Sequence, residues 1–226
     1  MGSPAETPWL STVGYGHTVG RRSRQSRPAA GRRGPDHFSR QARRTGYPAR
    51  SVFKLVEIDR RFAVLRPGDS VLDLGAAPGS WSLYCLKRVG PRGSVTAIDR
   101  VPLPDTLRQA MLNQPLEYYQ ADITVEMELA SLLAERTFRA VLSDAAPNTT
   151  GNALVDGTRS HKLVDAVCGI AGRHLAPGGV MIAKLLQAED LSALLDHWRP
   201  EFASLRTAKP AASRVESREV FIVGRR

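Results

Sequence analysis

The stretch from Ser70 to Ser82, SVLDLGAAPGSWS, constrains the fold of this chain more than any other. It begins with a short apolar run of the kind that forms a strand buried on both faces. A turn of small residues follows between Gly75 and Gly79, and glycine lets the backbone approach a ligand where a Cβ would collide. The N–H groups that open the next helix can bind an anionic group or a carboxylate. The order strand, glycine-rich turn, helix therefore predicts a nucleotide-type cofactor at the first strand of an α/β sheet.

The spacing of these glycines narrows the kind of cofactor. They are arranged as Gly-x-x-x-Gly rather than Gly-x-Gly-x-x-Gly, the fingerprint of dinucleotide sites. This spacing disfavours a dinucleotide oxidoreductase and favours S-adenosylmethionine. A tight turn between two packed elements would produce the same glycines, and it is the structural alternative.

The rest of the chain alternates between strand and helix patterns, which predicts a doubly wound α/β sheet with helices on both faces. Strands are expected over 70–74, 94–99, 116–120, 140–144, 180–185, 205–208 and 218–223. Helices are expected from 36 to about 44 and over 51–62, 81–89, 155–175 and 190–197. No helix fits between the last two strands, so we expect them to pair antiparallel.

Charged residues stand where four of these strands end. Asp99 closes the second strand, 24 positions beyond Gly75, where a βαβ nucleotide fold places the carboxylate for ribose hydroxyls. Asp122 follows the third strand and could accept a hydrogen bond from an adenine amino group or cap its own loop. Asp144 ends the fourth strand, and Lys184 ends an apolar strand, where a lysine is costly unless it is used or paired. These positions predict a site at the carboxyl edge of the sheet.

Lys54 lies in the helix expected over 51–62. The apolar side of that helix leaves Lys54 and Glu57 on its flank. The pattern by itself is therefore equally compatible with an ordinary surface lysine and with a functional group.

The positive charge is concentrated at the beginning of the chain. Residues 1–50 hold ten arginines against Glu6 and Asp36, a formal charge of +8 out of +10 for all 226 residues. We expect two parts: a basic arm over 1–35, disordered or ordered by a partner, and a folded domain over 36–226. Such an arm is typical of a segment that binds nucleic acid, of a solvated tail or of a targeting segment.

The cysteines and the hydropathy exclude two classes of protein. Cys85 and Cys168 are isolated in sequence, and the five histidines show no ligand spacing with them, so we expect neither a metal site nor a disulfide framework. No run of 18 apolar residues occurs. We therefore expect a soluble protein with no membrane partner.

Five motifs occur in an order that resembles the FtsJ/RrmJ family of ribose 2′-O-methyltransferases. They are FKL at 53–55, DLGAAPGSWS at 73–82, SDAAPN at 143–148, Lys184, and SRVESREV at 213–220. The resemblance runs from about Asp36 to the end of the chain. It implies a Rossmann-like methyltransferase fold with a seven-stranded, mostly parallel sheet and an antiparallel last strand, S-adenosylmethionine as the methyl donor, and large-subunit ribosomal RNA as the usual substrate.

The same resemblance implies roles for individual residues. The family's catalytic tetrad falls on Lys54, Asp144, Lys184 and Glu219. Its cofactor contacts fall on Gly75, Gly79, Ser80, Trp81, Asp99, Asp122 and again Asp144. Ser80 is a departure, because relatives often have a second glycine there. The long Arg-rich arm is another, because bacterial members do not need it.

These residue types suit methylation of a ribose hydroxyl. The hydroxyl is a poor nucleophile until its proton is removed or its oxygen is held near a strong acceptor. A free lysine with a pKa of about 10.4 is mostly protonated at neutral pH, so a base role requires a lowered value. Lys54 and Lys184 converging on one pocket would supply the necessary repulsion. Whether Lys184 is the base or orients the substrate and stabilises the forming alkoxide stays open.

The expected partner is ribosomal RNA in a large-subunit precursor particle, with the protein a monomer outside it. The long arm favours a mitochondrial location, with a bacterial-type cytoplasm or the nucleolus as alternatives. Two other functions stay open: 2′-O-methylation of tRNA or of an mRNA cap, and noncatalytic ribosome assembly with the same fold. An intact tetrad favours catalysis.

Overall fold

The computed structural model describes residues 37–103, 108, 112–186, 191–214 and 216–226. The expected arm over 1–35 lies outside these residues, so its structure and role stay predictions. None of the described helices is long and apolar enough to cross a membrane.

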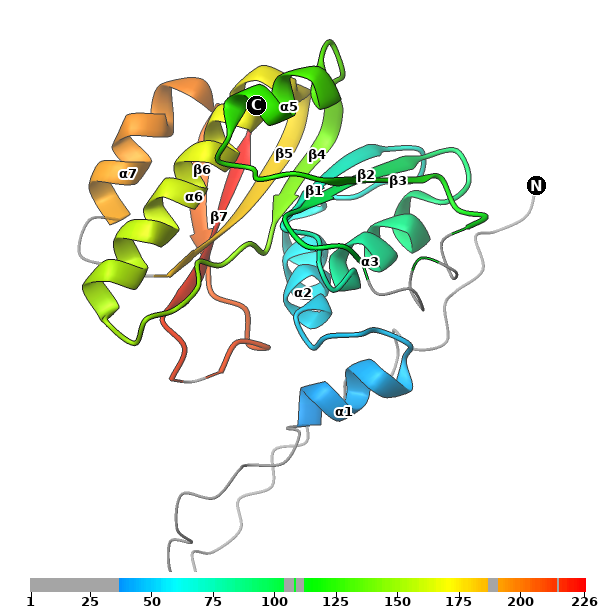
Figure 1. Cartoon of the computed structure of the whole chain (residues 1–226), viewed down its shortest axis with the longest axis horizontal. Helices are drawn as coiled ribbons and strands as arrows, with labels where there is room; N and C mark the ends of the chain where they lie inside the picture. The colour runs from blue at the N-terminus through cyan, green and yellow to red at the C-terminus, as the bar shows by residue number, and fades with distance from the viewer. Residues whose placement is uncertain (1–36, 104–107, 109–111, 187–190, 215) are drawn as a thin grey trace, which may run out of the picture. The chain divides into compact units, whose positions relative to one another are not determined.

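A seven-stranded sheet forms the centre of the domain, with strand order β3-β2-β1-β4-β5-β7-β6 (Figure 1). The strands are β1 Ser70–Leu74, β2 Ser94–Asp99, β3 Leu116–Gln120, β4 Phe138–Ser143, β5 Leu175–Leu186, β6 Ser204–Ala208 and β7 Glu219–Arg225. The five strands from β3 to β5 pair in parallel. β7 runs antiparallel to both β5 and β6. The predicted fold class, with its antiparallel last strand, is confirmed.

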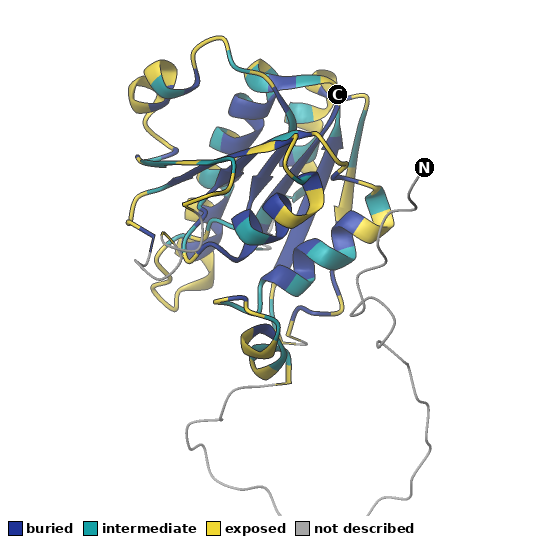
Figure 2. Ribbon diagram, turned by 90° about the vertical axis from the view of Figure 1, so that its right-hand side faces the viewer, coloured by how far each residue is buried: buried dark blue, intermediate teal, exposed yellow. Residues whose placement is uncertain are grey.

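Helices cover both faces of this sheet (Figures 1 and 2). They are α1 His37–Arg44, α2 Val52–Phe62, α3 Ser80–Val89, α5 Glu126–Leu133, α6 Ala153–His174, α7 Leu191–Trp198 and a short 3₁₀ turn, Arg199–Glu201. One apolar core lies under α2 and α3, and the other lies under α5, α6 and α7. Because both faces are covered, the central strands are almost entirely buried, as their apolar runs indicate.

The helix α5 was not expected, and β5 and α6 begin earlier than the sequence indicated. The turn expected at Pro177–Gly179 lies inside β5, where the register shifts as Phe138 pairs with Leu175 and Ala140 with Val180. An irregularity in the ladder therefore takes up the glycines without ending the strand. α6 begins at Ala153, two residues early, because the Asn152 side chain accepts the N–H groups of Leu154 and Val155 as an N-cap.

The two cysteines are buried and free. Burial raises the pKa of the Cys168 thiol to about 12 and that of Cys85 well above its ordinary value. Both therefore act as small apolar core residues.

Candidate active site

A cavity of about 710 Å³ opens at the carboxyl ends of β1 to β4, beside the first turns of α6. Its lining residues come from the glycine turn, the segments after β2, β3 and β4, and α6. They include Gly75, Ala77, Asp99, Arg100, Asp122, Asp144, Asn148, Arg159 and Lys162. Open α/β sheets bind ligands at this edge. Three carboxylates predicted from strand ends, those of Asp99, Asp122 and Asp144, thus line one cavity.

Gly75 brings the glycine turn close to the segment after β4. Its φ is +76°, and a Cβ added there would lie 2.7 Å from the Cβ and 2.8 Å from the Cα of Ala145. Any larger residue would therefore push the two walls of the cavity apart. The glycine is required both for its backbone conformation and for this close approach.

Asp99 joins the glycine turn to the end of β2. One of its carboxylate oxygens accepts the N–H of Ala77 at 2.9 Å, and the other accepts the N–H of Val101 at 3.1 Å. These bonds fix the side chain at the wall of the cavity while lone pairs remain for other donors. The predicted contact of Asp99 with ribose hydroxyls stays a prediction.

Asp122 serves its own loop as well as lining the cavity. Its Oδ1 accepts hydrogen bonds from the N–H and hydroxyl of Thr124, and its Oδ2 lies 3.9 Å from Arg100. The bonds from Thr124, with a smaller contribution from the charge of Arg100, lower the pKa of Asp122. The loop-capping alternative is thus present in the structure, and the adenine contact stays a prediction.

Gly79, Ser80 and Trp81 do not line the cavity. The Ser80 hydroxyl is buried and exchanges hydrogen bonds with the backbone N–H and C=O of Ala49. The Trp81 indole N–H donates to the carbonyl of Ser51 at 3.0 Å, and its ring stacks on Phe221. In this structure Ser80 and Trp81 fix the start of α2 against α3. Their predicted cofactor contacts, and that of Gly79, stay predictions.

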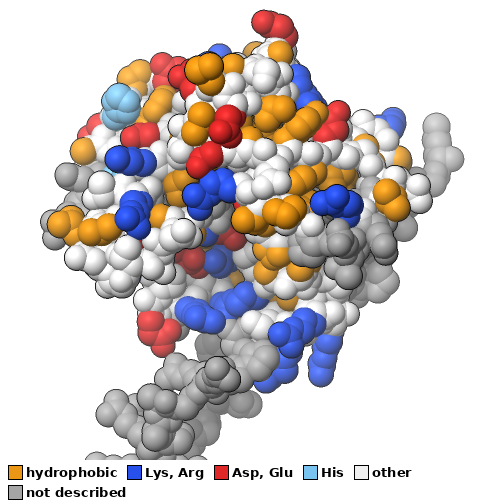
Figure 3. Space-filling model, viewed as in Figure 1, with side chains coloured by type: hydrophobic (Ala, Val, Ile, Leu, Met, Phe, Trp, Pro, Cys, Tyr) orange, Lys and Arg blue, Asp and Glu red, His pale blue; other side chains and the backbone are white. Residues whose placement is uncertain are grey.

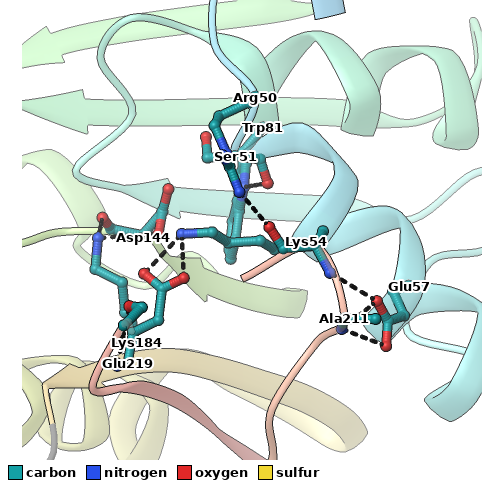
Figure 4. Close-up of polar contacts among 11 residues, drawn as sticks. Arg50, Ser51, Lys54, Glu57, Trp81, Asp144, Lys184, Ala211 and Glu219 are labelled. Carbon is teal, nitrogen blue, oxygen red and sulfur yellow. Dashed lines mark hydrogen bonds and ion pairs between the residues drawn. The ribbon is translucent and has the colours of Figure 1, made fainter. Parts of the chain in front are cut away.

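The four tetrad residues form two ion pairs beside the cavity (Figure 4). Lys54 Nζ lies 2.7 Å from both carboxylate oxygens of Glu219, and both side chains are about nine-tenths buried. The reading of Lys54 as a surface lysine is therefore wrong. Lys184 Nζ lies 3.0 Å from Asp144 Oδ1 and also donates to the Asp144 carbonyl.

Four elements bring these side chains together. Asp144 follows β4, and Lys184 lies near the end of β5, the neighbouring parallel strand. Glu219 opens β7 opposite Leu186 of β5. Lys54 reaches the same place from α2. Burial opposes the charged form of Glu219, but the hydrogen bond and charge of Lys54, with the charge of Lys184, outweigh it and lower the Glu219 pKa.

Asp73 is a buried carboxyl that the sequence reading did not single out. It stands one residue before the end of β1, is 1% exposed, and accepts the Ser82 hydroxyl at 2.6 Å. Burial, together with the charges of Asp144 and Asp99, raises the pKa of Asp73 to about 7, although the Ser82 bond opposes the change. The signal available in the sequence was a charged residue inside a buried apolar strand.

Metal ligation has no candidate among the residues that the structure describes. No group of three or more His, Cys, Asp or Glu side chains there could hold an ion.

Comparison with known proteins matches the sequence of this chain to one family. The model for FtsJ-like methyltransferases matches residues 47–226. The chain is 40% identical over 190 residues to "Ribosomal RNA large subunit methyltransferase E" of Sorangium cellulosum, with 84% of this chain and 87% of that protein covered. A protein of the same name from Nitratidesulfovibrio vulgaris is 43% identical over 190 residues, with 83% and 92% covered.

Solved structures agree with the sequence matches. A Plasmodium falciparum structure described as a ribosomal RNA methyltransferase is 25% identical with a TM-score of 0.64, and the match covers 79% of this chain and 97% of that one. Aeropyrum pernix fibrillarin, solved with S-adenosyl-L-methionine, has the same fold, with 14% identity, a TM-score of 0.55 and coverage of 77% and 76%. The family match spans the sheet, the cavity and both ion pairs, and the chain belongs to the FtsJ-like methyltransferase family.

Proposed function

We propose that this protein transfers a methyl group from S-adenosylmethionine to a ribose 2′-hydroxyl of large-subunit ribosomal RNA. The observation that carries the proposal is the pair of lysine–carboxylate contacts, Lys54–Glu219 and Lys184–Asp144, of which Asp144 lines the cavity. Support for the choice of RNA comes from relatives about 40% identical that are named ribosomal RNA large subunit methyltransferase E.

The residues of the cavity fit S-adenosylmethionine. Gly75 lines the cavity where the glycine turn meets Ala145, and Asp99 presents a fixed carboxylate for ribose hydroxyls. Asp122 lines the same cavity, and we assign it to the adenine as part of this proposal. When bound, the cofactor supplies a methyl group on a positively charged sulfur. Asp144 stands where its carboxylate favours that charge, at the junction between the cavity and Lys184.

Lys184 is positioned to act on the ribose oxygen. As an ammonium group it has three N–H bonds; one is donated to the Asp144 carbonyl, and the Asp144 carboxylate lies 3.0 Å away as an ion-pair partner. A further N–H can be donated to the 2′-oxygen and orient it as the oxygen attacks the methyl carbon. In its neutral form the same nitrogen can take the hydroxyl proton. Lys54, held by Glu219, places a second positive charge near the forming alkoxide.

The test is transfer of labelled methyl from S-adenosylmethionine to large-subunit ribosomal RNA or its precursor particles. Methylated ribose is identified by its resistance to alkaline cleavage, because the 2′-oxygen can no longer attack the phosphate. Label on a base rather than a ribose would refute the proposed reaction. Transfer to tRNA or to an mRNA cap, with none to ribosomal RNA, would instead change the substrate.

Basic surfaces support an RNA partner. Figure 3 shows Lys and Arg side chains gathered over α1 and around the segment that leads into β7. The exposed members include Arg40, Arg43, Arg44, Lys209 and Arg218. We propose that the precursor of the large subunit is the substrate particle and that the protein is monomeric outside it. The mitochondrial location, with residues 1–35 as targeting segment or RNA-binding arm, is part of the same proposal.

A further inference from the structure

One side of α2 holds the connection between β6 and β7 at three points. Arg50 stands two residues before the helix, and Lys54 and Glu57, three residues apart within it, lie on one side of α2. Their partners all lie in residues 209–219: Arg50 donates to the Ala212 carbonyl, Lys54 to Glu219, and Glu57 accepts from Ala211. The helix that carries a tetrad lysine therefore also anchors the segment that leads to its glutamate partner.

The carboxylate of Glu57, on α2, accepts hydrogen bonds from backbone N–H groups of this connection (Figure 4). The N–H of Ala211 lies 2.8 and 3.0 Å from the two carboxylate oxygens, and the N–H of Ala212 lies 3.4 Å from one of them. Arg50 holds the carbonyl of Ala212 at 2.6 Å. Hydrogen bonds to a charged group are shorter and stronger than neutral ones. Both polar groups of the Ala212 backbone are thus fixed by side chains at α2.

The ladder between β6 and β7 does not extend to Ala211 and Ala212. Glu219 is held by its pairing with β5 and by Lys54, whereas the ladder between β6 and β7 reaches only from Ser204 to Ala208 on the β6 side. Beyond Ala208 the described hydrogen bonds from the Ala211 and Ala212 backbone to the rest of the domain go to Glu57 and Arg50, while the Ala212 side chain is buried.

This connection also carries positive charge beside the tetrad. Lys209, Arg214 and Arg218 are exposed on it. Burial and the nearby charge of Arg214 lower the pKa of Arg50, whereas the Glu219 charge opposes the change, which indicates that these groups lie within electrostatic reach of one another. Exposed cations on the segment that leads to Glu219 are well placed for the phosphates that flank a target ribose.

We propose that Glu57 is a positioning residue: with Arg50 it holds the β6–β7 connection against α2 and so keeps the basic side chains of the connection in place for the RNA backbone. The choice of RNA rests on the proposed function. The inference predicts an effect on RNA binding rather than on the methyl-transfer step, because Lys54, Glu219, Lys184 and Asp144 keep their own contacts without Glu57.

The experiment compares Glu57→Ala, Glu57→Gln and a control, Asp196→Ala, in the full chain. Asp196 is an exposed carboxylate on α7 that pairs with Arg199, so the control also removes a charged hydrogen-bond acceptor. Glu57→Ala should speed hydrogen exchange at the Ala211 and Ala212 amides and raise KM for ribosomal RNA, each by about tenfold, the size of one lost charged hydrogen bond. Both kcat and the affinity for S-adenosylmethionine should stay within about twofold of wild type. Glu57→Gln should lie between, since its amide oxygen still accepts one N–H.

Three results would overturn the inference. Unchanged amide exchange in both Glu57 variants would show that the carboxylate does not hold the connection. Faster exchange with an unchanged KM would show that the connection is held but that RNA does not use it. A fall in kcat with KM unchanged would assign Glu57 to the chemical step instead. If Glu57→Ala fails to fold, amide exchange, KM and kcat of Glu57→Gln decide between the same three outcomes. Absence of methyl transfer by the wild type would refute the proposed function and leave the exchange measurement intact.

Discussion

Removal of the Glu219 carboxylate should cost far more stability than an ordinary ion pair contributes. Lys54 and Glu219 are each about nine-tenths buried, with Nζ 2.7 Å from both oxygens. Glu219→Ala leaves the Lys54 ammonium buried with its counter-charge gone. Loss of one partner of a buried pair costs about 3–5 kcal/mol, against about 0–1 kcal/mol for a surface pair. We expect the free energy of unfolding to fall by about 3 kcal/mol. This is the lower end of the range for buried pairs, because both side chains are still slightly exposed to water.

Urea unfolding followed by circular dichroism measures this loss, with Lys54→Met/Glu219→Leu as the comparison. The double variant replaces both charges by apolar groups of similar length and leaves no charge buried alone, so it should recover most of the lost stability. The pair has a pH signature as well. Because the Glu219 pKa is lowered on folding, its stabilisation is present above the unfolded pKa and is lost as pH falls through the folded value. A Glu219→Ala loss below about 1 kcal/mol, or a double variant less stable than the single one, would refute the buried-pair reasoning.

The remaining predictions concern the chemistry, the cofactor, the buried carboxyl and the arm. Lys184→Ala should keep the fold and cofactor affinity but lower methyl transfer by about 10²–10⁴-fold, and Lys184→Arg should fail similarly because a guanidinium cannot accept a proton; near-normal turnover in both would remove Lys184 from the mechanism. Asp99→Ala should weaken S-adenosylmethionine binding by about 1–3 kcal/mol in calorimetry, and unchanged affinity would reject the ribose contact. Because the Asp73 pKa is raised from 3.8 to about 7 on folding, one component of stability should fall as pH rises through that interval, and Asp73→Asn should remove it from the pH profile of unfolding. Deletion of residues 1–35 should lower RNA affinity and the slope of its salt dependence; an identical slope would favour a targeting role.

The strands could be predicted closely because a buried parallel strand appears as a continuous apolar run. β1 and β2, which are such runs, have the bounds that the sequence indicated, 70–74 and 94–99. β3 also has the indicated bounds, 116–120, although it is only partly buried. α5 was not predicted. At eight residues it is too short for a clear helical period, and only Leu129 and Leu133 of it are buried. The Pro-Gly-Gly of β5 has the local chemistry of a turn, but pairing with β4 on both sides keeps it within the strand.

Part of the site could also be predicted from position along the chain. Parallel strands end at the same edge of a sheet, so Asp99, Asp122 and Asp144 were expected together, and they line one cavity. The burial of Lys54 could not be predicted from its helix, because the partner that makes it tolerable, Glu219, is 165 residues away. For Ser80 and Trp81 the motif was clear, but their hydrogen bonds go to Ala49 and Ser51, which no local pattern indicates.

Carboxyl side chains gather around the glycine turn, which the net charge of the chain does not show. The chain carries a formal charge of +10, yet Asp73, Asp99 and Asp144 lie close enough around the glycine turn that the latter two raise the pKa of the first. Mutual repulsion among carboxylates is relieved by a positive ligand, and a sulfonium is one. Among the described residues, Arg100, Arg159 and Lys162 line the cavity, and other basic side chains are exposed over α1 and the β6–β7 connection, where they can meet a polyanion. Lys54 and Lys184 each form an ion pair with a carboxylate, that of Glu219 and that of Asp144. The two lysines proposed to meet the ribose are therefore already neutralised by partners within the domain.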